Sequence, residues 1–254
     1  MSGVIGMVYW LATMTDESQK AELKKQMVGA YFAAWRQDLG KAKELLGKPE
    51  YRLTAILVLS CYIAALARLR YPDTDSEREV YTTMLREYSG LKEYEWIDLR
   101  FFYQWRSSDH IDKRYRKALE GLENYEQIQK ILIKSFGDND QLAKGQEKDK
   151  YKKPAEVVQA VRANQTEGLN QENFEQKLQL FSVGEILYRI VRCNAVHETS
   201  FPLINRGQDA NGNLLYKEWH IITSDFLYTT VENILSKYEG ECMAEGEWPH
   251  AYRQ

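Results

Sequence analysis

The sequence predicts an all-α protein. Over nearly every long stretch, apolar residues recur at the three- and four-residue spacing of an amphipathic helix. Proline, glycine and asparagine lie between these stretches, where helices are expected to end. No alternating strand pattern extends beyond a few positions, and no segment repeats. A chain of 254 residues, 44% of them hydrophobic, is long enough for a large core, so we expect one helical domain over residues 1–254.

Three helices are expected in the first third of the chain. Residues 16–46 follow Thr15-Asp16, a typical helix N-cap. The expected buried stripe of this helix consists of Leu23, Met27, Ala30, Tyr31, Ala34 and Leu39. Residues 50–69 are apolar on almost every side, which indicates the central helix of the core. Pro72 stops that helix, and the third helix covers residues 76–88.

The middle of the chain is first aromatic and then strongly charged. Residues 96–105 are dense in aromatic side chains, and residues 112–136 have the pattern of one long helix. Residues 137–153 begin with a Gly-Asp-Asn-Asp break and continue with interleaved lysines and acids. We therefore expect a mobile, charged loop over about 137–153.

Three more helices are expected in the rest of the chain. A short helix over residues 155–164 leads to a long amphipathic one over residues 172–197. An Asn-Gly pair within residues 209–213 predicts a tight turn. The last helix is expected over residues 219–243.

Composition limits the classes of function. A formal charge of −3 gives no overall attraction to nucleic acid, so contact with RNA would need local basic patches. Cys61, Cys193 and Cys242 lie far apart, which indicates reduced thiols and neither a disulfide framework nor a zinc site. The apolar residues 4–14 are too few to span a bilayer and follow no basic segment. We expect a cytoplasmic protein with no membrane contact, metal or cofactor.

The end of the helix over residues 172–197 carries the most reactive set of side chains. Arg192, Asn194 and His197 place a guanidinium, a carboxamide and an imidazole within two helical turns. Arginine binds phosphate bidentately, and histidine transfers protons near neutral pH. Arg189 lies four residues after an acid, Glu185, in the order that favours a helix ion pair, and it could also reach RNA.

The string Tyr188-Arg-Ile-Val-Arg-Cys-Asn-Ala-Val-His197 closes this helix in an all-helical chain and resembles the motif of the HEPN ribonucleases. The apolar run Ala55–Ala67 resembles the second helix of these proteins. The resemblance implies a HEPN-like bundle with additional helices, acting as a metal-independent endoribonuclease in defence or as a toxin. It also implies a homodimer whose two motifs form one site, and an antitoxin or another regulatory partner.

The resemblance further implies a role for each residue. Arg192 would hold the scissile phosphate, and His197 would act on the 2′-hydroxyl or on the leaving 5′-oxygen. Asn194 would orient the phosphate or the imidazole. The products would be a 2′,3′-cyclic phosphate and a 5′-hydroxyl. Cys193 departs from the pattern, because a polar residue usually follows the arginine, and no tyrosine for adenylylation follows His197.

Two other interpretations remain open. The chain could be a HEPN-like module without catalysis that binds RNA or a partner protein, or a helical scaffold. On a regular helix, Arg192 and His197 would point about 140° apart. Sharing a site would then need a loosened helix or a second protomer. In the structural interpretation, Arg192 pairs with a helix carboxylate and His197 caps the helix C-terminus.

A basic cluster with aromatic neighbours is the second candidate surface. It consists of Arg106, Lys113, Arg114, Arg116 and Lys117, beside Tyr103 and Trp105. Cations with nearby rings suit single-stranded RNA, because phosphates bind the charges and bases stack on the rings. The alternative is a solvated helix face.

Overall fold

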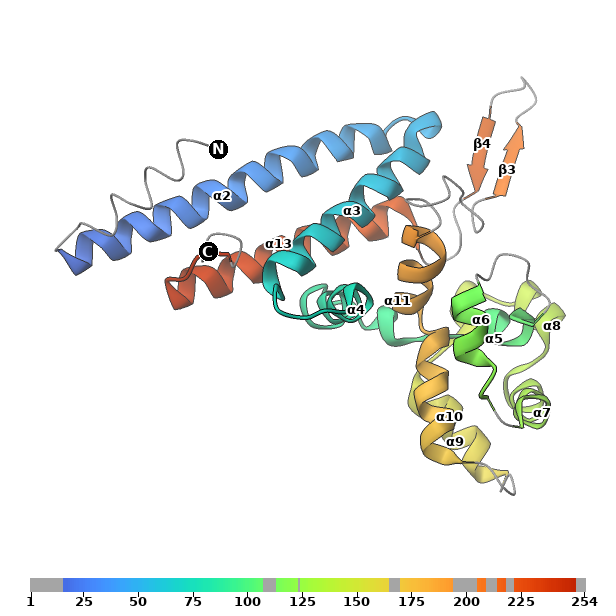
Figure 1. The fold of residues 1–254 in the computed structure, drawn as a ribbon. Helices are drawn as coiled ribbons and strands as arrows, with labels where there is room; N and C mark the ends of the chain where they lie inside the picture. Colours follow the sequence, from blue (N-terminus) through green and yellow to red (C-terminus); the bar gives the residue numbers. More distant parts are fainter. Residues whose placement is uncertain are drawn as a thin grey trace.

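The computed structural model describes residues 16–106, 113–122, 124–164, 170–193, 205–208, 214–217 and 222–249. These residues are predominantly helical, with a few short strands (Figure 1). The prediction of an all-α chain is confirmed.

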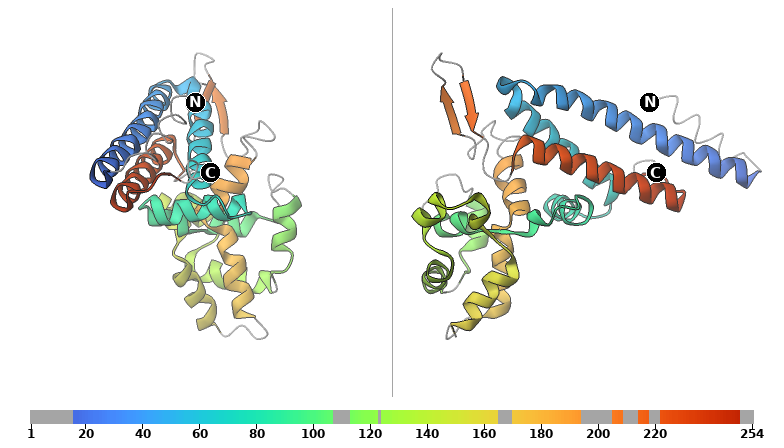
Figure 2. Two further views of the ribbon diagram at one scale, coloured as in Figure 1. Left: turned by 60° about the vertical axis from the view of Figure 1, so that its left-hand side comes forward. Right: turned by 180° about the vertical axis from the view of Figure 1, so that it is seen from behind.

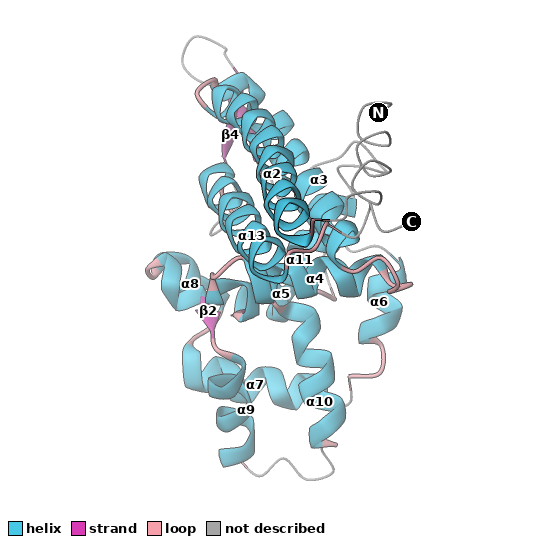
Figure 3. Cartoon of the chain, turned by 90° about the vertical axis from the view of Figure 1, so that its left-hand side faces the viewer, coloured by secondary structure: helices cyan, strands magenta, loops and turns pink. Residues whose placement is uncertain are grey.

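Four long helices from the two ends of the chain form the first layer. They are α2 (Glu17–Leu46), α3 (Arg52–Arg70), α4 (Glu77–Tyr88) and α13 (Ser224–Glu245). A 3-10 turn, η1 (Pro49–Tyr51), joins α2 to α3. The last helix, α13, packs against the other three, and it runs beside α2 in two different views (Figures 1 and 3). The first core lies among these helices.

Side-chain caps explain where these helices begin. The Asp16 carboxylate accepts hydrogen bonds from the backbone N–H groups of Ser18 and Gln19. Ser76 caps α4 and Thr223 caps α13 in the same way. Each cap satisfies N–H groups that have no partner within the helix. The predicted starts near residues 16 and 76 are confirmed.

The helix α3 is the centre of the first core, as expected. Its buried residues include Leu59, Ile63 and Leu66, and it packs against α2, α4 and α13. Among the described residues, α3 is also the helix that is long and apolar enough to cross a membrane. The central helix of a folded core meets the same criteria of length and composition.

The middle of the chain forms a second group of helices around a second core (Figure 2). The helices are α5 (Leu99–Gln104), α6 (Lys113–Leu119), α7 (Tyr125–Phe136), α8 (Asn139–Lys144), α9 (Pro154–Ala163) and α10 (Gln171–Leu178). A 3-10 turn, η2 (Lys92–Glu95), precedes this group. The fully buried Phe102, Phe174 and Phe181 belong to the second core.

The prediction of one helix over residues 112–136 is wrong. The helix α6 ends at Leu119 and α7 begins at Tyr125. Between them, Asn124 has a left-handed backbone with φ 56°. Asparagine tolerates this conformation better than most residues. The break lets the buried Leu122 and Tyr125 both face the second core.

The segment 137–153, expected as a charged loop, contains regular structure. The helix α8 begins with a capping box between Asp138 and Gln141. A 3-10 turn, η3 (Glu147–Lys150), leads to β2 (Tyr151–Lys152), which pairs antiparallel with β1 (Ile97–Asp98). Two buried side chains, Leu142 and Tyr151, explain the difference, because each anchors the charged segment to a core.

The prediction of one helix over residues 172–197 is also wrong. The helix α10 ends at Leu178, and a 3-10 turn, η4 (Gln179–Phe181), follows. Ser182 is extended, with ψ 151°, and caps a new helix, α11 (Val183–Ile186). The chain then continues as a π-helix, η5 (Leu187–Arg192).

The segment α11–η5 lies between the two cores (Figure 1). Val183, Leu187 and Val191 belong to the first core. Ile186 and Ile190 belong to the second. The segment that carries Arg189 and Arg192 is therefore packed against a hydrophobic core on each side.

The last irregular part of the chain contains a short hairpin. The strands β3 (Asn205–Gln208) and β4 (Leu214–Lys217) pair antiparallel. The predicted turn at residues 209–213 lies outside the described residues. The final helix begins at Ser224, five residues later than the position expected from periodicity.

Candidate functional site

The described part of the predicted site lies on the π-helix η5. Arg189 and Arg192 are on this helix. Asn194 and His197 lie outside the described residues, as do the side chains of Lys113 and Arg114. The structure therefore describes the arginines of the motif and their surroundings.

Arg192 is held by an acid and a ring. Its Nη2 is 3.3 Å from Oε2 of Glu77, in the first turn of α4. Its guanidinium lies over the ring of Tyr188, 5.4 Å from the centroid. The Arg192 side chain is 14% exposed, whereas that of Glu77 is 55% exposed. This pairing with a helix carboxylate is the one that the structural interpretation of the motif expects.

Two opposing effects act on the charge of Arg192. Burial lowers the pKa of Arg192. A hydrogen bond with Cys193 and the charges of Cys193, Tyr188 and Glu77 raise it, and together they exceed the effect of burial. The guanidinium is therefore a permanent cation at this position.

The ring that Arg192 covers contacts a second, buried tyrosine. Tyr188 packs against the ring of Tyr81, with 5.3 Å between the centroids. Burial raises the pKa of Tyr81 well above its usual value, and the charge of Arg192 partly offsets this effect. Within the described part of the chain, Nε of Arg192 is buried without a hydrogen-bond partner.

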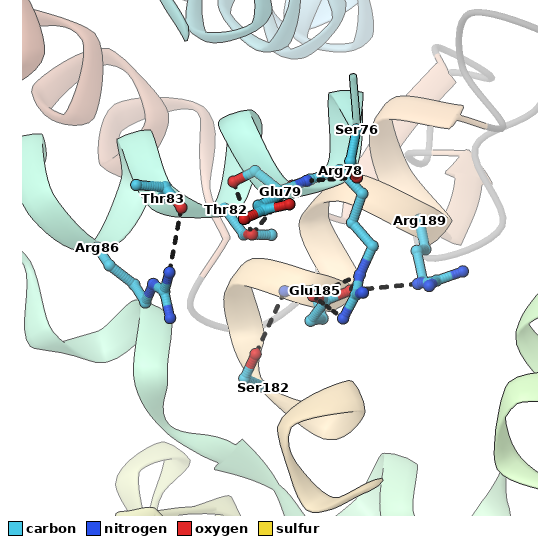
Figure 4. A network of polar contacts seen from close by, with 9 residues as sticks. All are labelled: Ser76, Arg78, Glu79, Thr82, Thr83, Arg86, Ser182, Glu185 and Arg189. Carbon is cyan, nitrogen blue, oxygen red and sulfur yellow. Dashed lines mark hydrogen bonds and ion pairs between the residues drawn. The ribbon is translucent and has the colours of Figure 1, made fainter. Parts of the chain in front are cut away.

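A buried carboxylate, Glu185, ties α11 to α4 (Figure 4). Arg78 donates from Nε to both carboxylate oxygens, at 2.8 Å each, and its Nη2 is 2.6 Å from Oε1. Nε of Arg189 donates to Oε2 at 3.2 Å. Ser182 accepts a hydrogen bond from the backbone N–H of Glu185. The predicted pair of Glu185 and Arg189 is confirmed.

Sequence reasoning missed Arg78 and Glu77. Arg78 is 107 residues away from Glu185, and Glu77 is 115 residues away from Arg192. No local spacing connects positions this far apart. The available signal was the charged first turn of α4, but its acids are also what any helix N-terminus favours.

The helix geometry near the motif is unusual. A π-helix has i→i+5 hydrogen bonds, is rare, and occurs frequently at functional sites. Here the π-helix covers six residues and ends at Arg192, inside the motif string Tyr188–His197. The regular helix assumed for the motif therefore does not describe its residues up to Arg192.

The basic cluster differs from the expected RNA surface. Tyr103 and Trp105 are buried in the second core. Arg106 lies over the rings of Tyr125 and Trp105, at 4.4 and 5.4 Å, and pairs with Glu126 at 3.3 Å. The expected stacking of RNA bases on Tyr103 and Trp105 is not supported, because the core already covers these rings.

A hollow elsewhere on the surface has fewer reactive side chains. A surface hollow of ≈ 630 Å³ lies between α9 and α10, and its lining includes the ion pair of Arg162 and Glu175. Among its described lining residues there is no cysteine, histidine or serine. In the described ranges, no group of three or more histidine, cysteine, aspartate or glutamate side chains is arranged to hold a metal ion.

Comparison with known proteins identifies no relative. No protein-family model matches the chain, and no curated protein or solved structure matches it. Its function therefore has to be inferred from its own residues and their contacts.

Proposed function

We propose that the chain is a metal-independent endoribonuclease of the HEPN type, acting as a cytoplasmic homodimer in defence or as a toxin. The single observation that supports this most is the setting of Arg192. It is a permanent cation that lies over the ring of Tyr188 at the end of a π-helix, a geometry that occurs frequently at functional sites.

The chemistry follows from the residue types. Arg192 is a permanent cation that is partly exposed, so it is suited to hold the scissile phosphate and the charge that develops on it. His197 of one protomer accepts the proton of the RNA 2′-hydroxyl, whose oxygen attacks the phosphorus. The bond from phosphorus to the 5′-oxygen breaks. The leaving oxygen takes a proton from the imidazolium of the other protomer, and Asn194 orients the phosphate or the imidazole.

A second candidate is a HEPN-like module without catalysis that binds RNA or a partner protein. The pairing of Arg192 with Glu77 favours it, because that carboxylate occupies the guanidinium on which catalysis depends. Cys193, in place of the usual polar residue, favours it as well.

The test is RNA cleavage in the presence of EDTA, with purified wild type, Arg192→Ala and His197→Ala. We expect the wild type to cleave and to leave 2′,3′-cyclic phosphate ends, and both variants to lose at least about a hundredfold in rate. Equal activity in all three proteins would reveal a contaminating nuclease and contradict the assignment. Binding without cleavage would favour the second candidate.

Light scattering tests the homodimer separately. We expect the mass of two chains at micromolar concentration. A strict monomer at high concentration would contradict a site that is shared between two protomers.

A further inference from the structure

We infer that Glu77 is a displaceable counter-ion, and that an RNA phosphate replaces its carboxylate on Arg192. This inference rests on the proposed function, because it takes the ligand of Arg192 to be a phosphodiester. It assigns a role in RNA affinity to a residue of α4 that lies outside the motif.

The pair of Glu77 and Arg192 has the properties of a weak contact. It has one N–O contact, at 3.3 Å, and more than half of the Glu77 side chain is exposed. Water screens such a pair, and holding the long glutamate side chain in one place costs conformational entropy. A phosphodiester presents two oxygens that match the fork of a guanidinium, so it is the stronger ligand.

Glu185, which also joins α4 to the segment α11–η5, shows the opposite arrangement. Its side chain is only 7% exposed, and Arg78 contacts it at 2.6–2.8 Å through two nitrogens. A buried carboxylate that is held by two arginines costs much more to displace than an exposed one that is held by a single contact. Of these two acids, Glu77 is therefore the one that a ligand can displace.

Arg192 can keep its place when Glu77 leaves. Its guanidinium lies over Tyr188, and it extends from a π-helix packed between the two cores. A phosphate that replaces Glu77 also keeps the charge of Arg192 balanced. It would lie close to the N-terminus of α4, where the helix dipole favours negative charge.

The experiment measures binding of an RNA oligonucleotide that is 2′-O-methylated at every position, so that it cannot be cleaved. Wild type, Glu77→Gln and Glu79→Gln are compared by fluorescence anisotropy at one salt concentration. Glu79→Gln is the matched control. Glu79 lies on the same exposed first turn, the charge change is the same, and its side chain points about 160° away from that of Glu77 around the helix.

We expect Glu77→Gln to bind the oligonucleotide roughly three- to tenfold more tightly than Glu79→Gln. In the Arg192→Ala background, this difference between the two glutamine variants should disappear. Circular dichroism checks that all variants are folded.

Equal or weaker binding by Glu77→Gln, compared with Glu79→Gln, would overturn the inference and leave the proposed function intact. Absence of RNA binding by the wild type and every variant would overturn both. A persistent difference in the Arg192→Ala background would also overturn the inference, because Glu77 would then act through another residue.

Discussion

Two glutamates on neighbouring elements show how solvent exposure determines the strength of an ion pair. Glu77 and Glu185 each pair with an arginine between α4 and the segment α11–η5. Glu77 is mostly exposed, so its ion pair contributes little to stability and can exchange. Glu185 is buried and binds both Arg78 and Arg189, so its removal would break two ion pairs, one of which joins α4 to the segment α11–η5.

Glu185→Gln should therefore destabilise the fold. We expect a loss of about 2–4 kcal/mol in the free energy of unfolding, somewhat below the usual cost of breaking a buried pair, because Arg78 is partly exposed. Urea denaturation measures it. The matched control is Glu126→Gln, which removes an exposed pair with Arg106 and should cost less than about 1 kcal/mol. Equal costs would contradict a structural role for Glu185.

At the scale of elements, the residues that cap a helix predict where it begins, but the spacing of its apolar residues does not predict which face is buried. The caps at Asp16 and Ser76 are where the sequence indicates them. On α2, however, the buried residues are Val28, Phe32, Leu39 and Ala42. Of the predicted stripe, only Leu39 is buried. The helix α2 packs mainly against α13, which is almost 200 residues later in the chain, and that partner selects a different face.

Gly184 and Gly240 both lie in helices, but they differ in how much space a side chain would have. In α11, a Cβ at Gly184 would lie 3.2 Å from the backbone oxygen of Tyr94 in η2. In α13, a Cβ at Gly240 would meet nothing within 4 Å. We expect Gly184→Ala to cost about 1–3 kcal/mol through this crowding. Gly240→Ala should stabilise by up to about 1 kcal/mol, because alanine is the better helix former.

Thermal denaturation of the two variants checks this prediction. A lower midpoint temperature for Gly184→Ala and a higher one for Gly240→Ala are expected. If Gly184→Ala were as stable as the wild type, η2 would yield by the few tenths of an ångström that the added methyl group needs, and the close approach would contribute nothing to stability.

At the scale of the whole molecule, the segment α11–η5 forms a wall between the two cores and packs into both. Residues from the two ends of the chain form most of the first core, and residues from its middle form the second. The segment α11–η5 contributes side chains to both. A wall shared in this way should couple the two cores, so that neither loses its packing alone.

Leu187→Ala and Ile190→Ala test this coupling from the two sides of the wall. Both side chains are almost fully buried, Leu187 in the first core and Ile190 in the second. Each substitution should cost about 2–5 kcal/mol. Each should shift one common urea transition, seen alike by circular dichroism and by tryptophan fluorescence. Two separated transitions in either variant would show that the cores unfold independently.

Short-range information in the chain is enough to predict the helical class, the capped helix starts, the apolar α3 and the pair of Glu185 with Arg189. Periodicity, caps and i, i+4 pairs act within one or two turns, so the residues alone report them. The breaks at Asn124 and Ser182, the π-helix at Arg192, and the roles of Glu77 and Arg78 needed the folded chain. The ion pairs join positions 107 and 115 residues apart, and the break at Asn124 follows from packing on the second core. No local pattern records such contacts.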